Sequence, residues 1–106
     1  MSAIVVLVTA PDASKAADIA KAVVEERLAA CGNVIPGLRS IYRWEGKVCD
    51  DPEVLLLLKT EAHLFEALRA KVVSLHPYQC PEVIALPVQA GHAPYLEWIA
   101  KSVQSE

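Results

Sequence analysis

Residues 34–58 read VIPGLRSIYRWEGKVCDDPEVLLLL and hold two extended segments joined by one tight turn, from which the arrangement of the other elements follows. Glu45-Gly46 predicts the turn, since glycine supplies the positive φ that a hairpin needs. Pro36-Gly37 predicts a bend in the first segment. Val54–Leu58 is apolar at every position, which is typical of a central strand. Both segments exceed the usual strand length of about 5–6 residues, so we expect the hairpin tip to project beyond the sheet.

One strand and one helix are predicted before this hairpin. Ile4–Val8 is a β-branched apolar run, which indicates a strand. Asp12 is placed to cap a helix that we predict over residues 13–31, with Gly32 as its left-handed terminator. One face of that helix carries apolar residues at spacings of three and four: Ala17, Ala20, Val24, Leu28 and Cys31.

A second helix, a loop, a strand and a third helix are predicted after the hairpin. Thr60 is predicted to cap the second helix, which we expect to end before His76-Pro77 because helices usually stop before a proline. Residues 76–82 then form a loop stiffened by two prolines. Val83–Val88 predicts a strand whose internal proline favours a sheet edge. Pro94 suits the first turn of the last helix.

The order of these elements is β-α-β-β-α-β followed by a C-terminal helix, which predicts the α+β class and a ferredoxin-like sandwich. Its core would be a four-stranded antiparallel sheet with both crossover helices on one face. A chain of 106 residues is expected to form a single domain, residues 1–106. Hydrophobic residues make up 54% of the chain, and several strands are apolar on both faces, yet the helices cover only one face. The uncovered face therefore predicts a partner, such as an identical copy of the chain.

Charge and hydropathy argue against several classes of function. Ten Lys and Arg against thirteen Asp and Glu give a net charge of −3 without a basic block, so nucleic acid is not an expected partner. No apolar run approaches the roughly 20 residues of a membrane span, and the N-terminus does not read as a leader, so we expect a cytoplasmic protein. The three cysteines are widely spaced and are expected to be reduced. Neither a glycine-rich phosphate loop nor a Ser-His-Asp order occurs, so no enzymatic reaction is predicted.

One proline-stiffened loop contains an imidazole, a thiol and a carboxylate, those of His76, Cys80 and Glu82. All three groups can ligate a transition metal, so the loop is a candidate metal site. The alternative is structural: His76 would close the preceding helix, Cys80 would pack as a small apolar residue, and Glu82 would be solvated or paired. Both interpretations stay open at the level of the sequence.

A second group of residues combines aromatic rings with charges on the hairpin and in the loop after the second helix: Tyr42, Trp44, Glu45, Lys59, Tyr78 and Glu82. Aromatic side chains at a subunit interface commonly pack, while charged groups pair at the rim. The same groups could instead line a ligand cleft between subunits. The sequence therefore leaves packing and ligand binding as two interpretations of this group.

Several short motifs, taken in order along the chain, resemble the CutA family of divalent-cation tolerance proteins. They are the segments VTAP (residues 8–11), ERLAAC (26–31), SIYRWEGK (40–47), LKT (58–60) and HPYQCPE (76–82). The resemblance implies a ferredoxin-like protomer in a tight homotrimer, with long hairpins pairing between subunits as in the trimeric PII-like signalling proteins. It also implies a role in tolerance to copper and other divalent cations, with copper binding and without an enzymatic reaction.

The resemblance further implies a ligand set. In bacterial relatives, copper is assigned to a cysteine near the end of the first strand and to a His-His pair before the Pro-Tyr motif. The matching residues here are Val8, Leu75 and His76, so only His76 is kept. We therefore expect copper or another divalent transition metal to bind through His76, with help from Cys80 or Glu82. The alternative is a PII-like trimeric signalling scaffold that binds a small molecule or a protein in the inter-subunit cleft.

Overall fold

The structure, a computed structural model, describes residues 2–106, so Met1 of the predicted domain lies outside it. Along the chain the elements are β1 (Ala3–Ala10), α1 (Ala13–Glu25), β2 (Cys31–Trp44), β3 (Lys47–Glu61), a 3-10 turn (Ala62–Leu64), α2 (Phe65–Leu75), β4 (Val83–Pro87) and α3 (Ala93–Ser102). This order confirms the predicted α+β class and the β-α-β-β-α-β arrangement. None of the helices in residues 2–106 has the length and apolarity needed to cross a lipid bilayer.

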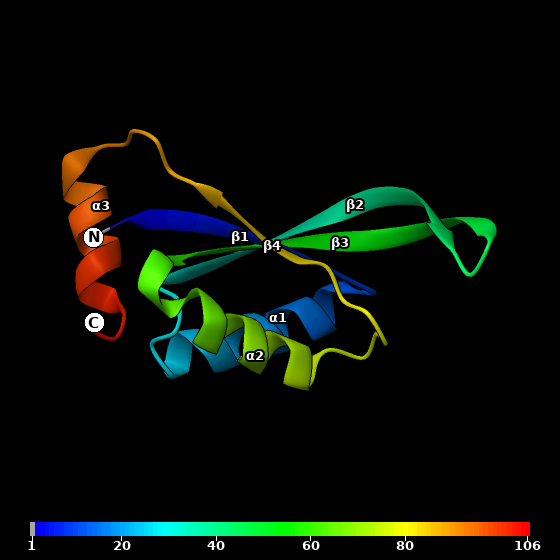
Figure 1. Ribbon diagram of the computed structural model, residues 1–106, viewed down its shortest axis with the longest axis horizontal. Helices are drawn as coiled ribbons and strands as arrows, with labels where there is room; N and C mark the ends of the chain where they lie inside the picture. The colour runs from blue at the N-terminus through cyan, green and yellow to red at the C-terminus, as the bar shows by residue number, and fades with distance from the viewer. Residues whose placement is uncertain (1) are drawn as a thin grey trace.

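The strands form one four-stranded antiparallel sheet in the order β2-β3-β1-β4. Figure 1 shows α1 and α2 side by side on one face of this sheet, while α3 lies at the end that holds both chain termini. At the opposite end, β2 and β3 continue as a two-stranded ribbon, and the molecule measures 44 × 26 × 22 Å. The projecting hairpin is confirmed, and β4, which contains Pro87, is an edge strand as predicted.

The tight turn and the bend of the hairpin lie where the sequence predicts them. Glu45 and Gly46 have φ of 51° and 79°, and positive values at both positions match the twist of the flanking strands. Gly37 has a φ of 90°, and the pairing of β2 with β3 shifts register between Ile35 and Leu38. A bulge of this kind bends a strand and increases its local twist. It separates the part of β2 that belongs to the sheet from the projecting ribbon.

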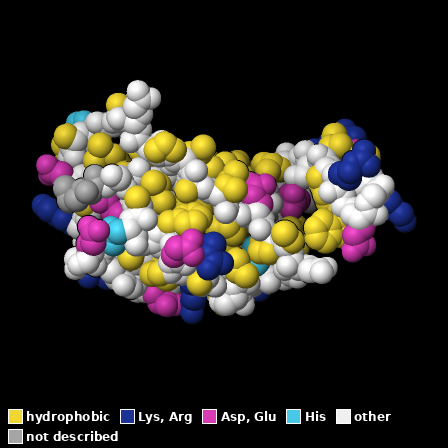
Figure 2. Space-filling model, viewed as in Figure 1, with side chains coloured by type: hydrophobic (Ala, Val, Ile, Leu, Met, Phe, Trp, Pro, Cys, Tyr) yellow, Lys and Arg dark blue, Asp and Glu magenta, His cyan; other side chains and the backbone are white. Residues whose placement is uncertain are grey.

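Alternate residues of β1 and β3 point into one core between the sheet and the helices. The buried strand residues are Ile4, Val6, Val8, Ala10, Val54, Leu56 and Leu58, and the helices contribute Ala16, Ile19, Val23, Leu68 and Val72. On the other face of the sheet, Ile84 and Leu86 of β4 are 53% and 54% exposed. Figure 2 shows hydrophobic side chains gathered over β1 and β4. The sheet therefore has one covered and one uncovered face, as its apolar strands predict.

Helix α1 ends at Glu25, earlier than the predicted residue 31. Arg27 takes the left-handed conformation, with a φ of 58°, and the amides of Arg27 and Leu28 bond to carbonyls in the last turn of α1. These two bonds form a Schellman ending, in which the left-handed residue is usually glycine. Here the Arg27 guanidinium donates to three successive carbonyls at the end of α3, at 2.9–3.3 Å. Because a contact between distant segments holds this ending, the local sequence did not reveal it.

Gly32 and Thr60 do not have the roles predicted for them. Gly32 lies within β2, where a Cβ atom would stand 2.9 Å from Cβ of Ala20, so it permits the close approach of α1 to the sheet. Thr60 is buried within β3, and its hydroxyl donates to the carbonyl of Leu28 at 2.7 Å. Helix α2 begins at Phe65, after the 3-10 turn. The predicted terminator and the predicted cap are wrong because both residues serve the packing of the sheet.

Gly32→Ala should lower the free energy of unfolding by about 1–3 kcal/mol, because the new methyl group must displace α1 or β2. Ala20→Gly alone should cost about 1 kcal/mol through its lower helix propensity. The double variant should lose less than the sum of the two, since removing one Cβ makes room for the other. Chemical denaturation at one fixed protein concentration measures all three values. Strict additivity would contradict the close contact.

Candidate functional site

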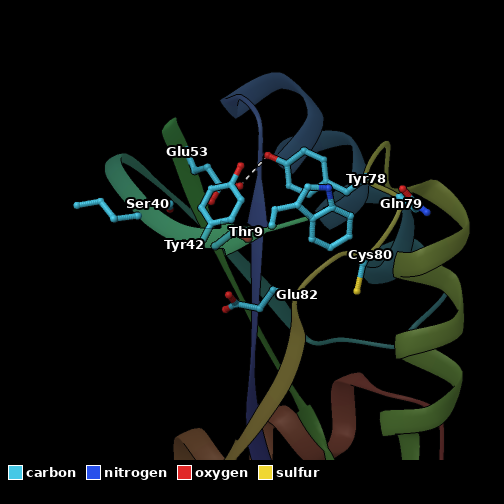
Figure 3. A pocket seen from close by; sticks show the side chains of 10 residues that line it. Thr9, Ser40, Tyr42, Glu53, Tyr78, Gln79, Cys80 and Glu82 are labelled. Carbon is cyan, nitrogen blue, oxygen red and sulfur yellow. Dashed lines mark hydrogen bonds between the residues drawn. The ribbon is translucent and has the colours of Figure 1, made fainter. Parts of the chain in front are cut away.

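A cleft of about 540 Å³ lies where the hairpin, the end of β1 and the loop after α2 meet (Figure 3). Its walls are Thr9 of β1, Ser40, Ile41, Tyr42 and Trp44 of β2, Glu53 of β3, and Tyr78, Gln79, Cys80 and Glu82 of the loop. Strand alternation places Ser40, Tyr42 and Trp44 on one face of β2. Pro77 and Pro81 restrict the backbone of the loop. The cleft therefore joins residues that lie far apart in the sequence.

Two hydrogen bonds from phenols to carboxylates hold the aromatic side of the cleft. The Tyr78 hydroxyl donates to Oε2 of Glu53 at 2.7 Å and joins the loop to β3 (Figure 3). The Tyr42 hydroxyl donates to Oδ2 of Asp51 at 2.6 Å, across the hairpin. Hydrogen bonds to an ionised acceptor are stronger than those between neutral groups. The two bonds therefore fix the positions of both rings.

The pKa of both phenols is raised, although the main cause differs between them. The hydrogen bond to Asp51 raises the pKa of Tyr42 to about 12. Burial, followed by the hydrogen bond to Glu53, holds the pKa of Tyr78 well above its usual value near 10. Both phenols therefore remain neutral donors at physiological pH. The stabilisation that they contribute is present below about pH 10 and is lost as the pH rises toward the folded-state pKa.

His76 is buried beside the cleft, against the ring of Tyr78, and is only 8% exposed. Its Nε2 lies 2.7 Å from the carbonyl oxygen of Thr9, and its Nδ1 accepts a hydrogen bond from the amide of Tyr78 at 3.2 Å. Because Nδ1 accepts, the proton of the neutral ring is assigned to Nε2, which donates it to Thr9. The His76 side chain thus anchors the start of the loop to β1, while its backbone amide caps α2 by donating to the carbonyl of Val73 at 3.3 Å.

The predicted metal ligands are not brought together as a set of three. Cys80 and Glu82 are exposed and line the cleft, whereas His76 does not line it. Within residues 2–106, no three His, Cys, Asp or Glu side chains are grouped so that they could hold one metal ion. Val8 is fully buried and Leu75 is half-buried, and neither offers a donor atom. Cys80 and Glu82 are the members of the predicted set that line the cleft.

Four of the predicted cleft residues line the cleft: Tyr42, Trp44, Tyr78 and Glu82. The structure does not place Glu45 or Lys59 in it. Glu45 lies in the hairpin turn, and Lys59 lies six positions beyond Glu53 in β3, which corresponds to about 20 Å of strand. Lys59 donates instead to Oδ1 of Asn33 at 2.7 Å. The sequence indicated which residues belong to the hairpin. It did not indicate how far each of them lies from the end of β1, where the cleft forms.

Five residues line the cleft without having been predicted for it: Thr9, Ser40, Ile41, Glu53 and Gln79. Leu55 lies opposite Thr9 in the pairing of β1 with β3, and Glu53 is two residues from Leu55. Strand alternation therefore puts Thr9, Leu55 and Glu53 on one face of the sheet. Glu53 is also the carboxylate that directly precedes the apolar run of β3. What the sequence did not supply was the register that brings the two strands together.

Comparisons with known proteins find relatives over almost the whole chain. A family model described as "CutA1 divalent ion tolerance protein" matches residues 4–102. The chain is 54% identical over 98 residues to the divalent-cation tolerance protein CutA of Thermus thermophilus, covering 92% of this chain and 95% of that protein. It is 52% identical over 98 residues to Protein CutA of Homo sapiens, covering 92% of this chain but 55% of the human protein, and so spans about half its length. The crystal structure of CutA1 from Oryza sativa has a TM-score of 0.96 at 44% identity, covering 100% of this chain and 97% of that chain.

Asp51→Asn should return the pKa of Tyr42 from about 12 toward the ordinary value near 10, because the acceptor of its proton loses its charge. Glu53→Gln should lower the pKa of Tyr78 in part, because burial, the larger cause of its raised pKa, remains. The ultraviolet absorbance of tyrosinate as a function of pH measures both, and Tyr42→Phe and Tyr78→Phe identify the two components. Circular dichroism at each pH is the control for unfolding. Ionisation of Tyr42 near pH 10 in the unmodified protein would contradict its hydrogen bond.

Proposed function

The chain belongs to the CutA1 divalent ion tolerance family, and we propose that it serves divalent-cation tolerance by binding copper or another divalent transition metal. A relative that covers most of the chain carries divalent-cation tolerance in its name. The observation that carries the proposal is that Cys80 and Glu82 present a thiol and a carboxylate to the same cleft. The proposed activity is binding, without a catalysed reaction.

Cys80 and Glu82 would supply the first two ligands. A thiolate favours metals such as copper and zinc, and a carboxylate adds negative charge to the site. His76 would supply a third through Nδ1, because its Nε2 is already held on the carbonyl of Thr9. A backbone carbonyl behind the second ring nitrogen is a common support of a metal-bound histidine. Nδ1 becomes available when the 3.2 Å bond from the amide of Tyr78 is released, so the third ligand requires a movement of the loop.

We also propose a homotrimer in which neighbouring subunits cover the exposed face of the sheet. Apolar residues line that face on three adjacent strands: Val5 and Leu7 of β1, Leu55 and Leu57 of β3, and Ile84 and Leu86 of β4. An apolar face of this kind is typical of an interaction surface. The strands β2 and β4 lie at the two edges of the sheet, where a neighbouring strand can add. The number of three subunits rests on the family resemblance.

A second candidate function is that of a PII-like signalling scaffold that binds a small molecule in the cleft. The cleft volume of about 540 Å³ falls within the roughly 300–1,000 Å³ typical of ligand pockets. Tyr42 and Trp44 line the cleft and remain 43% and 42% exposed, so their rings are accessible to a ligand. The bond between Tyr78 and Glu53 fixes a third ring beside them. The rings of one subunit are therefore accessible, as ligand binding requires.

We propose further that residues 1–106 act as one CutA-like domain in the cytoplasm. Arg27 ties the end of α1 to the end of α3, so the last helix is joined to the β-α-β-β-α-β unit. Cys31, Cys49 and Cys80 are free thiols. Reduced cysteines are expected in a reducing compartment.

Cys80→Ser should lower the affinity for Zn²⁺ and Cu²⁺ by at least about tenfold, because it removes the softest ligand. Glu82→Gln and His76→Gln should also weaken binding. Cys31→Ser is the matched control, since Cys31 is a free thiol outside the cleft. Calorimetry on metal-free protein measures each isotherm, with Zn²⁺ as the probe that undergoes no redox chemistry. An unchanged isotherm in the Cys80 variant, or an equal loss in the Cys31 variant, would contradict the loop site.

Leu86→Lys should convert the trimer into smaller species, because a lysine ammonium buried in an apolar interface must lose its hydration. Val73→Lys is the matched control, since Val73 is 40% exposed on α2, in the layer of helices. Sedimentation velocity at micromolar concentration measures the assembly of both variants. We expect a trimer for the unmodified protein and for the Val73 variant. A monomeric unmodified protein would refute the argument from the uncovered face.

A further inference from the structure

We propose that the cleft binds an organic cation, a molecule that carries an ammonium or guanidinium group on an apolar frame. This inference rests on the second candidate function, ligand binding in the cleft, and names the chemical class of the ligand. Three properties of the cleft carry it: the sign of its charge, its aromatic walls and its size.

The charge that one subunit contributes to the cleft is negative. Glu53 and Glu82 contribute carboxylates, and in the described chain no lysine or arginine is among the lining residues. Arg39 lies on β2 close to the cleft in sequence, but strand alternation turns it to the other face of the hairpin. There its guanidinium is held by Asp50, with the closest N–O distance at 2.7 Å. A phosphate or carboxylate ligand would therefore meet repulsion in the cleft, whereas a cation would meet attraction.

Three aromatic rings, those of Tyr42, Trp44 and Tyr78, line the same cleft. The face of an aromatic ring attracts a cation placed within about 6 Å of its centre, and tryptophan does so most strongly. Figure 3 shows the Tyr42 and Tyr78 rings next to Glu53. The hydroxyls of both rings donate to carboxylates, at 2.6 and 2.7 Å, so negative charge stands behind each phenol. Rings and carboxylates in this combination are the elements of an aromatic cation site.

The size of the cleft favours an organic molecule over a bare ion. A volume of about 540 Å³ accommodates a carbon frame, which the rings can contact, together with one charged group. Glu53 is placed to receive that group. Within residues 2–106 its carboxylate accepts from the Tyr78 hydroxyl at Oε2, which leaves Oε1 for an N–H of the ligand. The ligand would lay its frame on the rings and direct its cationic group toward Glu53.

The test compares three small probes that share one phenyl frame: phenethylammonium, phenylpropionate and phenylpropanol. Phenethylammonium should bind best, and Trp44→Leu and Glu53→Gln should each weaken its binding by at least about fivefold. Trp98→Leu is the matched control, because Trp98 is 45% exposed on α3, outside the cleft. Calorimetry at millimolar probe concentration measures the affinities, and Zn²⁺ titrated in parallel reports on the metal proposal by itself.

Stronger or equal binding of phenylpropionate or phenylpropanol would overturn the cationic class while leaving the cleft as a ligand site. Binding of none of the three probes would overturn both the inference and the second candidate function. An equal loss of affinity in the Trp44 and Trp98 variants would place the binding elsewhere and would also overturn the inference. A loss confined to the Trp44 and Glu53 variants is the result that supports it.

Discussion

β1 pairs with only part of β3, and the place where this pairing ends determines where the projecting ribbon begins and where the cleft forms. The two strands pair from Ala3 opposite Glu61 to Ala10 opposite Val54. Beyond Val54, β3 continues beside β2 as the projecting ribbon. Val54 is also the outermost buried residue of β3, and Glu53 is the first residue past it. The cleft forms at this step because the ribbon supplies one wall, the end of β1 supplies the floor, and the loop after α2 supplies the other wall.

The uncovered face of the sheet and the cleft form one continuous surface. Strand alternation puts Leu7 and Thr9 of β1 on this face together with Leu55 and Glu53 of β3. The surface is therefore apolar over the centre of the sheet and polar where the sheet narrows into the ribbon. Hydrophobic residues make up 54% of the chain, and this second apolar face explains why the proportion exceeds the roughly 45–50% usual for soluble domains. A subunit that covered the apolar part would also adjoin the cleft.

The features that the sequence predicted are those with a local physical cause. Glu45-Gly46 needs positive φ at a turn, and His76-Pro77 cannot continue a helix, so both boundaries were found. Arg27 was missed because its left-handed conformation is held by carbonyls at the far end of the chain. The cleft was predicted only in part, because some of its residues also depend on contacts between distant segments. Its aromatic residues follow from composition, whereas the inclusion of Glu53 and the exclusion of Lys59 depend on strand register.

The two candidate ligands would occupy one negatively charged cleft, the metal at Glu82 and the organic cation at Glu53, so their binding would be coupled. A divalent metal held by Cys80 and Glu82 would place positive charge in the cleft where the organic cation requires negative charge. The metal would therefore weaken the organic cation, and linkage requires that the organic cation weaken the metal by the same factor. The loop that contains Tyr78 would add to this mutual weakening. Release of its amide from His76 would free Nδ1 for a metal, but the same movement would disturb the ring that Glu53 holds against the cleft. Metal binding and organic-cation binding would thus favour different positions of one loop, and a rise in metal concentration would displace the organic ligand.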